Sequence, residues 1–257
     1  MSANSSEVSR PALFLMLLET RALTEFGAYC WTYPWFSLAP RGDGHPVLVL
    51  PGFLASGSST LPLRHFLKRL GYQGHRWKLG RNLGGIGQKE REILARVREL
   101  RRRYGQRVSL IGWSLGGVYA RELAWMSPDD IRQVITLGTP FRHPRATSVT
   151  ELYEDISGQR EAHMPEDLVA RIPEPPPVPS TSIYSRSDGV VAWPCSLEKA
   201  SPTTENIRVY GSHCGLGHNP LALWAIADRL AQPEGRWRPF KAPMVAGFAY
   251  PRPDHLE

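Results

Sequence analysis

The apolar residues of this 257-residue chain fall into short dense runs that alternate with segments of helical spacing. Three runs are rich in valine, isoleucine and leucine, as is typical of strands buried on both faces: 46–50, 108–112 and 133–137. Weaker patterns predict strands at 74–79, 182–184 and 207–210. Helices are predicted at 63–70, 89–103, 117–126 and 221–230. This alternation predicts the α/β class, with a mostly parallel central sheet flanked by helices, in a single domain of residues 1–257.

The N-terminal segment, residues 11–36, is predicted to be an amphipathic helix to about Tyr29, followed by a cluster of aromatic residues. Such a segment can pack on the domain and help to close a pocket, or it can lie on a membrane. Glu19, Arg21 and Glu25 give it a mixed rather than a basic polar face. This favours packing on the domain, and a weak contact with a membrane surface or lipid is the second alternative.

The start of the chain shows no signature of a targeting or membrane-spanning segment. The apolar stretch 12–18 is too short to cross a bilayer. No basic leader precedes it and no small-residue cleavage site follows. The three cysteines, Cys30, Cys195 and Cys214, have no paired spacing, which favours reduced thiols and offers no zinc site. We therefore expect a cytoplasmic protein with no bound metal.

The region between Phe141 and Ser180 has no long periodicity. The run from Pro173 to Pro179 predicts a stiff linker, and short amphipathic pieces such as 150–156 predict short helices. About forty residues are too many for a simple connection between two strands, and long loops in compact domains are commonly lids, other functional loops or disordered segments. We expect a cap or lid insertion at 143–180; a surface insertion without a catalytic part is the alternative.

The formal net charge of +7 would suit an anionic partner. Much of the charge lies in the predicted helix 89–103, where arginines surround an apolar stripe formed by Ile93, Val97, Leu100 and Tyr104. That pattern favours a solvated outer helix face over a nucleic-acid site. Because no basic stretch interleaves with aromatics in a known nucleic-acid motif, we expect no nucleic-acid partner.

The sequence from Gly112 to Gly116 matches the pattern G-x-S-x-G, with Ser114 at its centre. A serine hydroxyl is a poor nucleophile, so it must stand exposed on a tight turn where a base can reach it. The motif lies between a predicted strand and a predicted helix, where glycines allow strand and helix to pass closely. The positive end of that helix faces any oxyanion formed at the serine. These features predict a nucleophilic serine.

A serine nucleophile needs a base, and the base needs an orienting acid. Asp188 directly follows one predicted strand, and His213 follows the next. In parallel sheets the site lies at the carboxyl ends of the strands, so the three side chains can converge there. His218, Glu151, Glu154 and Asp155 are alternatives for these two roles.

The ordered set of segments resembles the α/β-hydrolase superfamily, in particular its compact bacterial lipases and esterases. The resemblance rests on five segments across about two-thirds of the chain: Val47 to Phe53, Gly112 to Gly117, Leu137 to Pro140, Ser185 to Val191 and Ser212 to Pro220. His213-Cys-Gly-Leu216 fits the frame that several small lipases carry at the catalytic histidine, whereas His218 does not. The resemblance implies the α/β-hydrolase fold.

The same resemblance implies an acyl-transfer mechanism. Ser114 would be the nucleophile, His213 the base and Asp188 its acid partner. The oxyanion hole would use the backbone N–H groups of Leu115 and Phe53. The chain has Pro51-Gly52 where many members of the superfamily have His-Gly; because the donor is a backbone N–H group, this departure leaves the mechanism intact.

The expected function is therefore hydrolysis of carboxylic esters, with apolar acyl or polyester-type substrates that are small or polymeric, and no metal or organic cofactor. Trp113 and Leu54 are expected to bind substrate, and the aromatics from Tyr29 to Phe36 could line the acyl pocket. An acyltransferase, a thioesterase or an amidase on the same fold stays open. A non-catalytic binding protein is a more distant alternative, because Ser114, Asp188 and His213 form a complete set.

Overall fold

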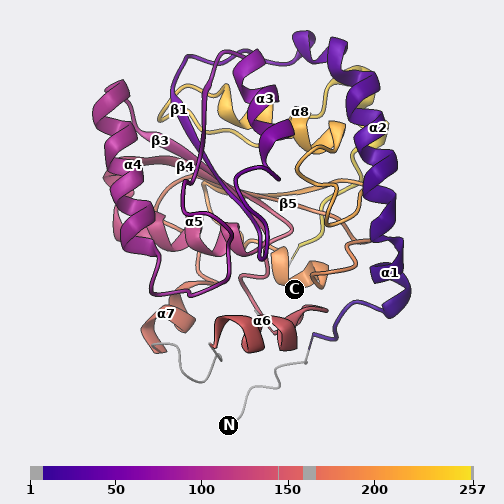
Figure 1. The fold of residues 1–257 in the computed structure, drawn as a ribbon. Helices are drawn as coiled ribbons and strands as arrows, with labels where there is room; N and C mark the ends of the chain where they lie inside the picture. Colours follow the sequence, from indigo (N-terminus) through magenta and orange to yellow (C-terminus); the bar gives the residue numbers. More distant parts are fainter. Residues whose placement is uncertain (1–7, 144, 159–165, 256–257) are drawn as a thin grey trace.

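The computed structural model describes residues 8–143, 145–158 and 166–255. Its centre is a six-stranded, fully parallel sheet with strand order β2-β1-β3-β4-β5-β6 (Figure 1). The strands are β1 (Pro46–Leu50), β2 (Gln73–Arg76), β3 (Val108–Trp113), β4 (Ile131–Leu137), β5 (Ser180–Tyr184) and β6 (Thr204–Arg208). The predicted α/β class and parallel sheet are confirmed.

The edge strands differ from the prediction because their apolar pattern is weak. The pattern predicts the last strand at 207–210, but β6 pairs with β5 from Thr204 to Arg208. Only Thr204 and Ile207 of this strand are buried, so its apolar pattern is too sparse to indicate where the strand begins and ends. The hydrogen-bonded pairing with β5 determines those bounds instead. Strand β2 is short and lies outside the buried core, and it ends at Arg76 rather than at residue 79.

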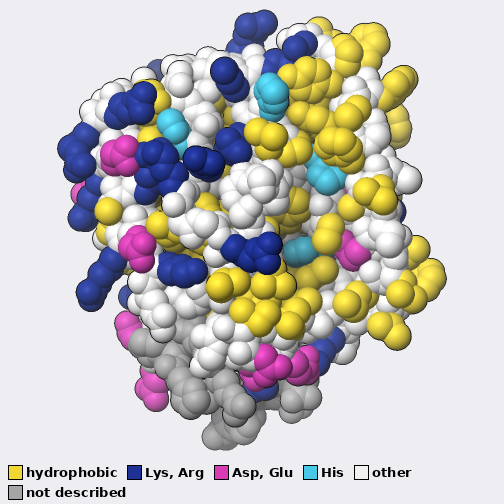
Figure 2. All heavy atoms as spheres, viewed as in Figure 1, with side chains coloured by type: hydrophobic (Ala, Val, Ile, Leu, Met, Phe, Trp, Pro, Cys, Tyr) yellow, Lys and Arg dark blue, Asp and Glu magenta, His cyan; other side chains and the backbone are white. Residues whose placement is uncertain are grey.

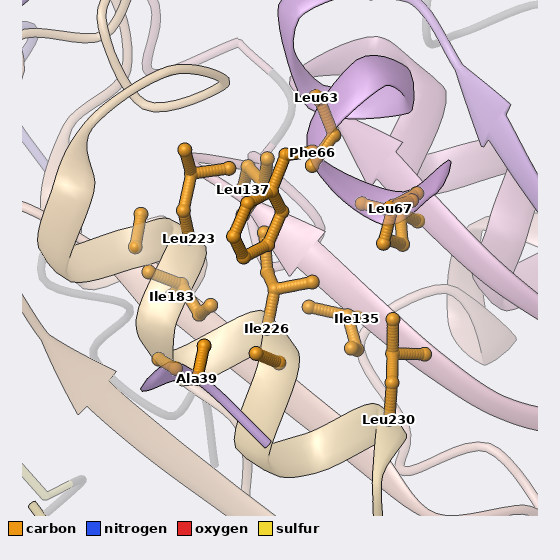
Figure 3. Close-up of a cluster of buried hydrophobic side chains, with 14 of the residues drawn as sticks. Ala39, Leu63, Phe66, Leu67, Ile135, Leu137, Ile183, Leu223, Ile226 and Leu230 are labelled. Atoms are coloured by element: carbon orange, nitrogen blue, oxygen red, sulfur yellow. The ribbon is translucent and has the colours of Figure 1, made fainter. Parts of the chain in front are cut away.

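Helices cover both faces of the sheet and create two apolar cores. Alternate residues of β1 show the division: Val47 and Val49 pack with α3 (Leu61–Arg69) and α8 (Pro220–Leu230). Leu48 and Leu50 pack with α4 (Glu90–Tyr104) and α5 (Leu115–Met126) on the opposite face. This follows from the two-residue period of a strand. Figure 3 shows the first core, where Phe66 of α3 meets Leu223 and Ile226 of α8.

Local signals explain where these helices begin and end. The Asn219 side chain caps α8 by accepting hydrogen bonds from two backbone N–H groups, and Pro220 occupies the first helical position. Helix α4 buries Ile93, Val97 and Leu100 and turns most of its arginines outward, as its sequence predicts. It ends at Gly105, whose left-handed backbone suits glycine.

The N-terminal segment contains four short pieces instead of one helix. They are α1 (Leu13–Leu17), the 3₁₀ helix η1 (Leu18–Arg21), α2 (Ala22–Thr32) and the 3₁₀ helix η2 (Tyr33–Leu38). Tyr29 and Phe36 are buried on the α3–α8 side, with the Phe36 ring centroid 4.8 Å from that of Phe66. The expectation that this aromatic cluster lines an acyl pocket is therefore wrong for Tyr29 and Phe36, which belong to the core.

The described residues of the predicted insertion at 143–180 include two helices, α6 (Thr150–Ser157) and α7 (Glu166–Arg171), which lie together at one end of the molecule (Figure 1). Its residues 144 and 159–165 lie outside the described residues, as do residues 1–7 of the N-terminal region. The buried Arg121 of α5 holds the C-terminal part of the insertion by donating hydrogen bonds to the carbonyls of Ile172 (3.0 Å) and Glu174 (2.7 Å). In the part of the chain that the structure describes, the other 3₁₀ helices are η3 (Pro128–Asp130), η5 (Trp193–Ser196) and η6 (Met244–Ala249).

None of the helices in the described residues is both long and apolar enough to cross a bilayer. Cys30, Cys195 and Cys214 are all free thiols, as their spacing predicts.

Candidate active site

Ser114 stands on a sharp turn between β3 and α5. Its backbone has φ +52° and ψ −123°, a strained conformation for a residue with a side chain. The Ser114 N–H donates to the carbonyl of Leu137 at the end of β4 (2.8 Å). A side chain at Gly112 would overlap the backbone of Gly116 and Gly117, so the motif's first glycine allows the close approach of strand and helix. The sequence therefore forms the local geometry of a nucleophile elbow.

Asp188 and His213 come together above the ends of β5 and β6. Their Oδ2 and Nδ1 atoms are 2.7 Å apart, and the side chains are buried, with 4% and 6% of their surface exposed. The other carboxylate oxygen of Asp188 accepts hydrogen bonds from the N–H groups of Val190 (2.8 Å) and Val191 (2.7 Å). These bonds fix the carboxylate, which in turn orients the imidazole.

The surroundings of His213 favour its protonated form. Burial opposes the charged imidazole and lowers the pKa of His213. The negative charge of Asp188, the hydrogen bond to it and the more distant Glu19 carboxylate together outweigh burial, so the pKa of His213 is raised above its usual value near 6.5. A raised pKa makes the imidazole a stronger base, which suits proton abstraction from a hydroxyl group.

Gly138, the residue that follows β4, lies directly against the Asp188–His213 pair. A Cβ atom there would be 2.9 Å from Asp188 Oδ2 and 3.0 Å from His213 Nδ1. The residue before Gly138, Leu137, accepts a hydrogen bond from the Ser114 N–H. The end of β4 therefore contacts both the serine turn and the Asp188–His213 pair. Within the described residues no hydrogen bond links the Ser114 hydroxyl to His213; catalytic bonds of this kind commonly shorten only when substrate binds.

Two backbone donors lie beside Ser114. In the described part of the chain, neither the Phe53 N–H nor the Leu115 N–H has a hydrogen-bond acceptor. The loop that carries Phe53 is held by the buried Asn82. The backbone carbonyl of Asn82 accepts a hydrogen bond from the Leu54 N–H (2.7 Å), and its side-chain amide donates one to the Pro51 carbonyl (2.9 Å). Two unpaired donors next to a serine can stabilise an oxyanion.

An apolar pocket opens on Ser114. Phe53, Leu115, Val118, Val190 and Val191 contribute apolar side chains to its lining. The described part of the insertion contributes Thr147, Val149, Thr150 and Tyr153, together with the charged pair Arg145 and Glu154. The Tyr153 ring meets the Phe53 ring edge to face, with centroids 5.2 Å apart. The pocket is therefore suited to an apolar group attached to the atom that Ser114 attacks.

Trp113 and Leu54, which were expected to bind substrate, are not among the described residues that line this pocket. Alternate residues of β3 face opposite sides of the sheet, so Trp113 follows Ile111 to the α8 side. There its ring packs against Gly217 and its indole N–H donates to the His213 carbonyl (3.1 Å). Trp113 supports the loop that carries His213. Leu54 forms part of the turn after β1, with φ +60°.

Within the described residues, none of the alternative acids and bases is bonded to the Asp188–His213 pair. The His218 ring is bonded to the Ala22 carbonyl in α2 (3.0 Å) and meets Phe26 edge to face. Glu151 pairs with Arg10, and Glu154 lies 3.6 Å from Arg145. No group of three or more His, Cys, Asp or Glu side chains in the described residues could hold a metal ion.

The sequence patterns missed several residues around the site. Gly138 lies in the segment Leu137 to Pro140, but the sequence assigned it no contact with Asp188 or His213, and Asn82 carries no motif; both positions follow only from how strand ends and loops meet. Glu19, Arg21 and Glu25 were seen only as the polar face of a helix, yet all three bind the loops that carry Asp188 and His213. A mixed polar face offered no signal for such contacts.

Several solved structures are similar to this chain. The mature lipase of Bacillus licheniformis has a TM-score of 0.56 at 15% identity, covering 76% of this chain and 94% of its own. Lipase B of Aspergillus fumigatus has a TM-score of 0.54 at 16% identity, covering 74% and 53%, so this chain spans about half the length of that lipase. A pyrethroid hydrolase from Sphingobium faniae has a TM-score of 0.51 at 18% identity, covering 74% and 99%. No protein-family model and no curated protein matches the sequence.

Proposed function

Because the chain has the α/β-hydrolase fold, we propose that it is a serine hydrolase that cleaves carboxylic esters with apolar acyl groups. One observation carries the proposal: Ser114 lies on a strained turn, beside two unpaired backbone donors, at the mouth of an apolar pocket. The buried Asp188–His213 pair stands at the neighbouring strand ends.

The geometry suggests a two-step acyl transfer. His213 accepts the proton of the Ser114 hydroxyl while the serine oxygen attacks the ester carbonyl. The N–H groups of Phe53 and Leu115 hold the resulting oxyanion. The tetrahedral intermediate collapses, and His213 returns the proton to the departing alcohol. His213 then activates a water molecule, which attacks the acyl-enzyme, and the acid leaves as Ser114 regains its proton.

Asp188 acts through His213 in this scheme. Its carboxylate accepts the Nδ1–H of the imidazole and so leaves Nε2 free to take the serine proton. The two N–H groups of Val190 and Val191 keep the carboxylate in place during both steps. The resulting imidazolium is stabilised by a carboxylate that cannot turn away.

The pocket supports an ester with an apolar acyl group. Aliphatic and aromatic side chains cover most of its wall, and they gain favourable contacts with a hydrocarbon chain rather than with a charged group. The cap role of the insertion is part of this proposal, because Thr150 and Tyr153 lie across the pocket from the elbow. A cap there would shield the acyl-enzyme from bulk water.

The proposal is tested with nitrophenyl esters of graded chain length and with a fluorophosphonate probe for reactive serines. We expect ester hydrolysis and probe labelling in the wild type, and losses on the order of 10⁴-fold or more in Ser114→Ala and His213→Ala with the fold intact by circular dichroism. Ser59→Ala, at an exposed serine in the loop after β1, is the control and should behave as wild type.

Two outcomes would contradict the proposal. A wild-type protein that neither labels nor hydrolyses any of the esters is not a serine hydrolase of this kind. Ester products formed from added alcohol in preference to hydrolysis would instead identify an acyltransferase.

A further inference from the structure

The polar face of the N-terminal segment binds the two loops of the candidate site. We call residues 185–191 the acid loop and residues 211–218 the histidine loop. Glu19 bridges them: its Oε1 accepts the N–H groups of Gly189 (2.8 Å) and His213 (2.9 Å), and its Oε2 accepts the N–H of Cys214 (2.8 Å). One carboxylate therefore fixes the backbone of the histidine itself.

Two further charged residues extend this bridge along the segment. Arg21 donates to the Ser187 carbonyl and hydroxyl in the acid loop and to the Gly211 carbonyl in the histidine loop. Glu25 accepts the Ser212 N–H (2.7 Å) and lies 3.8 Å from the Arg21 guanidinium. The acid loop and the histidine loop are thus joined through side chains that lie 166 to 195 residues earlier in the chain.

The N-terminal segment turns its charges inward, which is the reverse of the usual arrangement in a helix on a domain surface. Every exposed side chain between residues 11 and 38 is uncharged. Leu23, Trp31 and Leu13 are 80%, 77% and 73% exposed. Figure 2 shows apolar side chains gathered along the side where α1 and α2 lie in Figure 1. Exposing this apolar surface is unfavourable, so the contacts with the two loops and the burial of Tyr29 and Phe36 must together hold the segment in this orientation.

We propose that Glu19 is a positioning residue of the catalytic centre, which holds the His213 backbone against Asp188 and places a negative charge near the imidazole. This inference rests on the proposed function. Glu19 is not among the residues that line the pocket at Ser114, and it acts through the acid loop and the histidine loop that it holds.

The charges around His213 give Glu19 this second role. The groups that face the histidine loop are Asp188 from the acid loop, Glu19, Arg21 and Glu25 from the N-terminal segment, and the adjacent Cys214 thiol. Burial of Glu19 raises its pKa, but the three N–H donors outweigh burial and leave the pKa below its usual value. Glu19 is therefore ionised at neutral pH, and its charge helps to raise the pKa of His213.

The sign of the expected effect follows. The base must be unprotonated to act, so the acid limb of the pH–rate profile reports the pKa of His213 in the free enzyme. Removing the negative charge of Glu19 lowers that pKa, and the acid limb moves to lower pH. A purely structural role for Glu19 would lower activity at every pH and would leave the limb where it is.

Two variants separate the contributions. Glu19→Gln removes the charge and turns one N–H acceptor into a donor; we expect kcat to fall by about 10-fold to 100-fold and the acid limb of kcat/KM to move down by about half a pH unit or more. Glu19→Asp keeps the charge but is one methylene too short to reach all three N–H groups; we expect a similar fall in kcat with no downward move of the limb. Glu92→Gln, an exposed carboxylate on α4, is the control and should change neither.

A second readout does not depend on turnover. The pKa of the His213 imidazole is measured by NMR in protein with isotope-labelled histidine, and it should be lower in Glu19→Gln than in the wild type. This measurement distinguishes the two proposals, because it retains its meaning even if the wild type hydrolyses no ester.

The proposal is overturned if folded Glu19→Gln keeps the wild-type kcat, acid limb and His213 pKa. If Glu19→Gln does not fold, Glu19→Asp decides: a reduced kcat with an unmoved limb supports the positioning role, and a wild-type kcat refutes it.

Discussion

The substitution Gly138→Ala tests how tightly the strand end controls the Asp188–His213 pair. The new methyl group would lie 2.9 Å from Asp188 Oδ2, 3.0 Å from His213 Nδ1 and 2.9 Å from Leu216 Cδ1. All three distances are shorter than ordinary van der Waals contacts of a carbon atom. Relief of all three contacts requires the Asp188–His213 pair to shift away from the strand end, against the two backbone hydrogen bonds that fix Asp188.

Two costs can be separated. Gly138 has φ +52°, and an alanine in the left-handed region costs roughly 1–2 kcal/mol of stability. For a chain of this length each kcal/mol lowers Tm by about 2–4 °C. The second cost falls on activity, because displacing a catalytic group by ~1 Å can reduce the rate about 10²-fold. We expect kcat to fall by about 10-fold to 100-fold.

Gly105→Ala is the matched control. Gly105 has φ +67° after the end of α4, so alanine has a similar backbone cost there. A Cβ atom at Gly105 would have no neighbour within 4 Å. The two variants should lose similar stability in thermal unfolding, and only Gly138→Ala should lose activity toward a short nitrophenyl ester.

Equal activities of the two variants, with the loss of Tm as expected, would refute this reasoning. They would show that the Asp188–His213 pair tolerates a methyl group beneath it. A drop in kcat for both variants would instead point to a general effect of left-handed alanines on the fold.

The remaining predictions concern other parts of the chain. His218→Ala should keep most of the activity and lose a little stability, as kinetics and thermal unfolding will show; an inactive variant would transfer the role of base to His218. Replacing residues 146–172 by a short Gly/Ser linker should preserve part of the short-ester activity and change the chain-length preference, whereas an unchanged profile would mean that the insertion is not a cap. Burial raises the pKa of the Cys195 thiol to about 12, so Cys195 should resist iodoacetamide at pH 8 in the native protein; mass spectrometry that finds it alkylated as fast as in the unfolded chain would contradict this.

Local patterns of the sequence were enough to predict the central part of the fold. The buried strands β1, β3 and β4 appear as dense apolar runs because both faces of a parallel sheet are covered by helices. The serine turn is local in the same sense, since strand, glycines and helix are contiguous in the chain. The sequence also indicated Asp188 and His213 as residues that follow strands, and their catalytic roles stay predictions.

The tertiary structure alone decided which side chains meet around the site. Trp113 seemed suited to a substrate pocket, but the alternation of β3 turns it to the α8 face, where it supports the histidine loop. Gly138 and His213 are distant in sequence, so no spacing rule links them.

The N-terminal segment shows most clearly that a sequence pattern does not reveal which groups a side chain will contact. Its periodicity indicated an amphipathic helix, and the usual inference is that charges face water and apolar residues face the core. In the structure Glu19, Arg21 and Glu25 face the acid and histidine loops, while Leu23 and Trp31 are exposed. Periodicity fixes which residues share a helix face, but it cannot say what that face meets. What the face meets depends on backbone N–H and carbonyl groups of loops 166 to 195 residues further along the chain. Those groups take up their positions only once the sheet has formed.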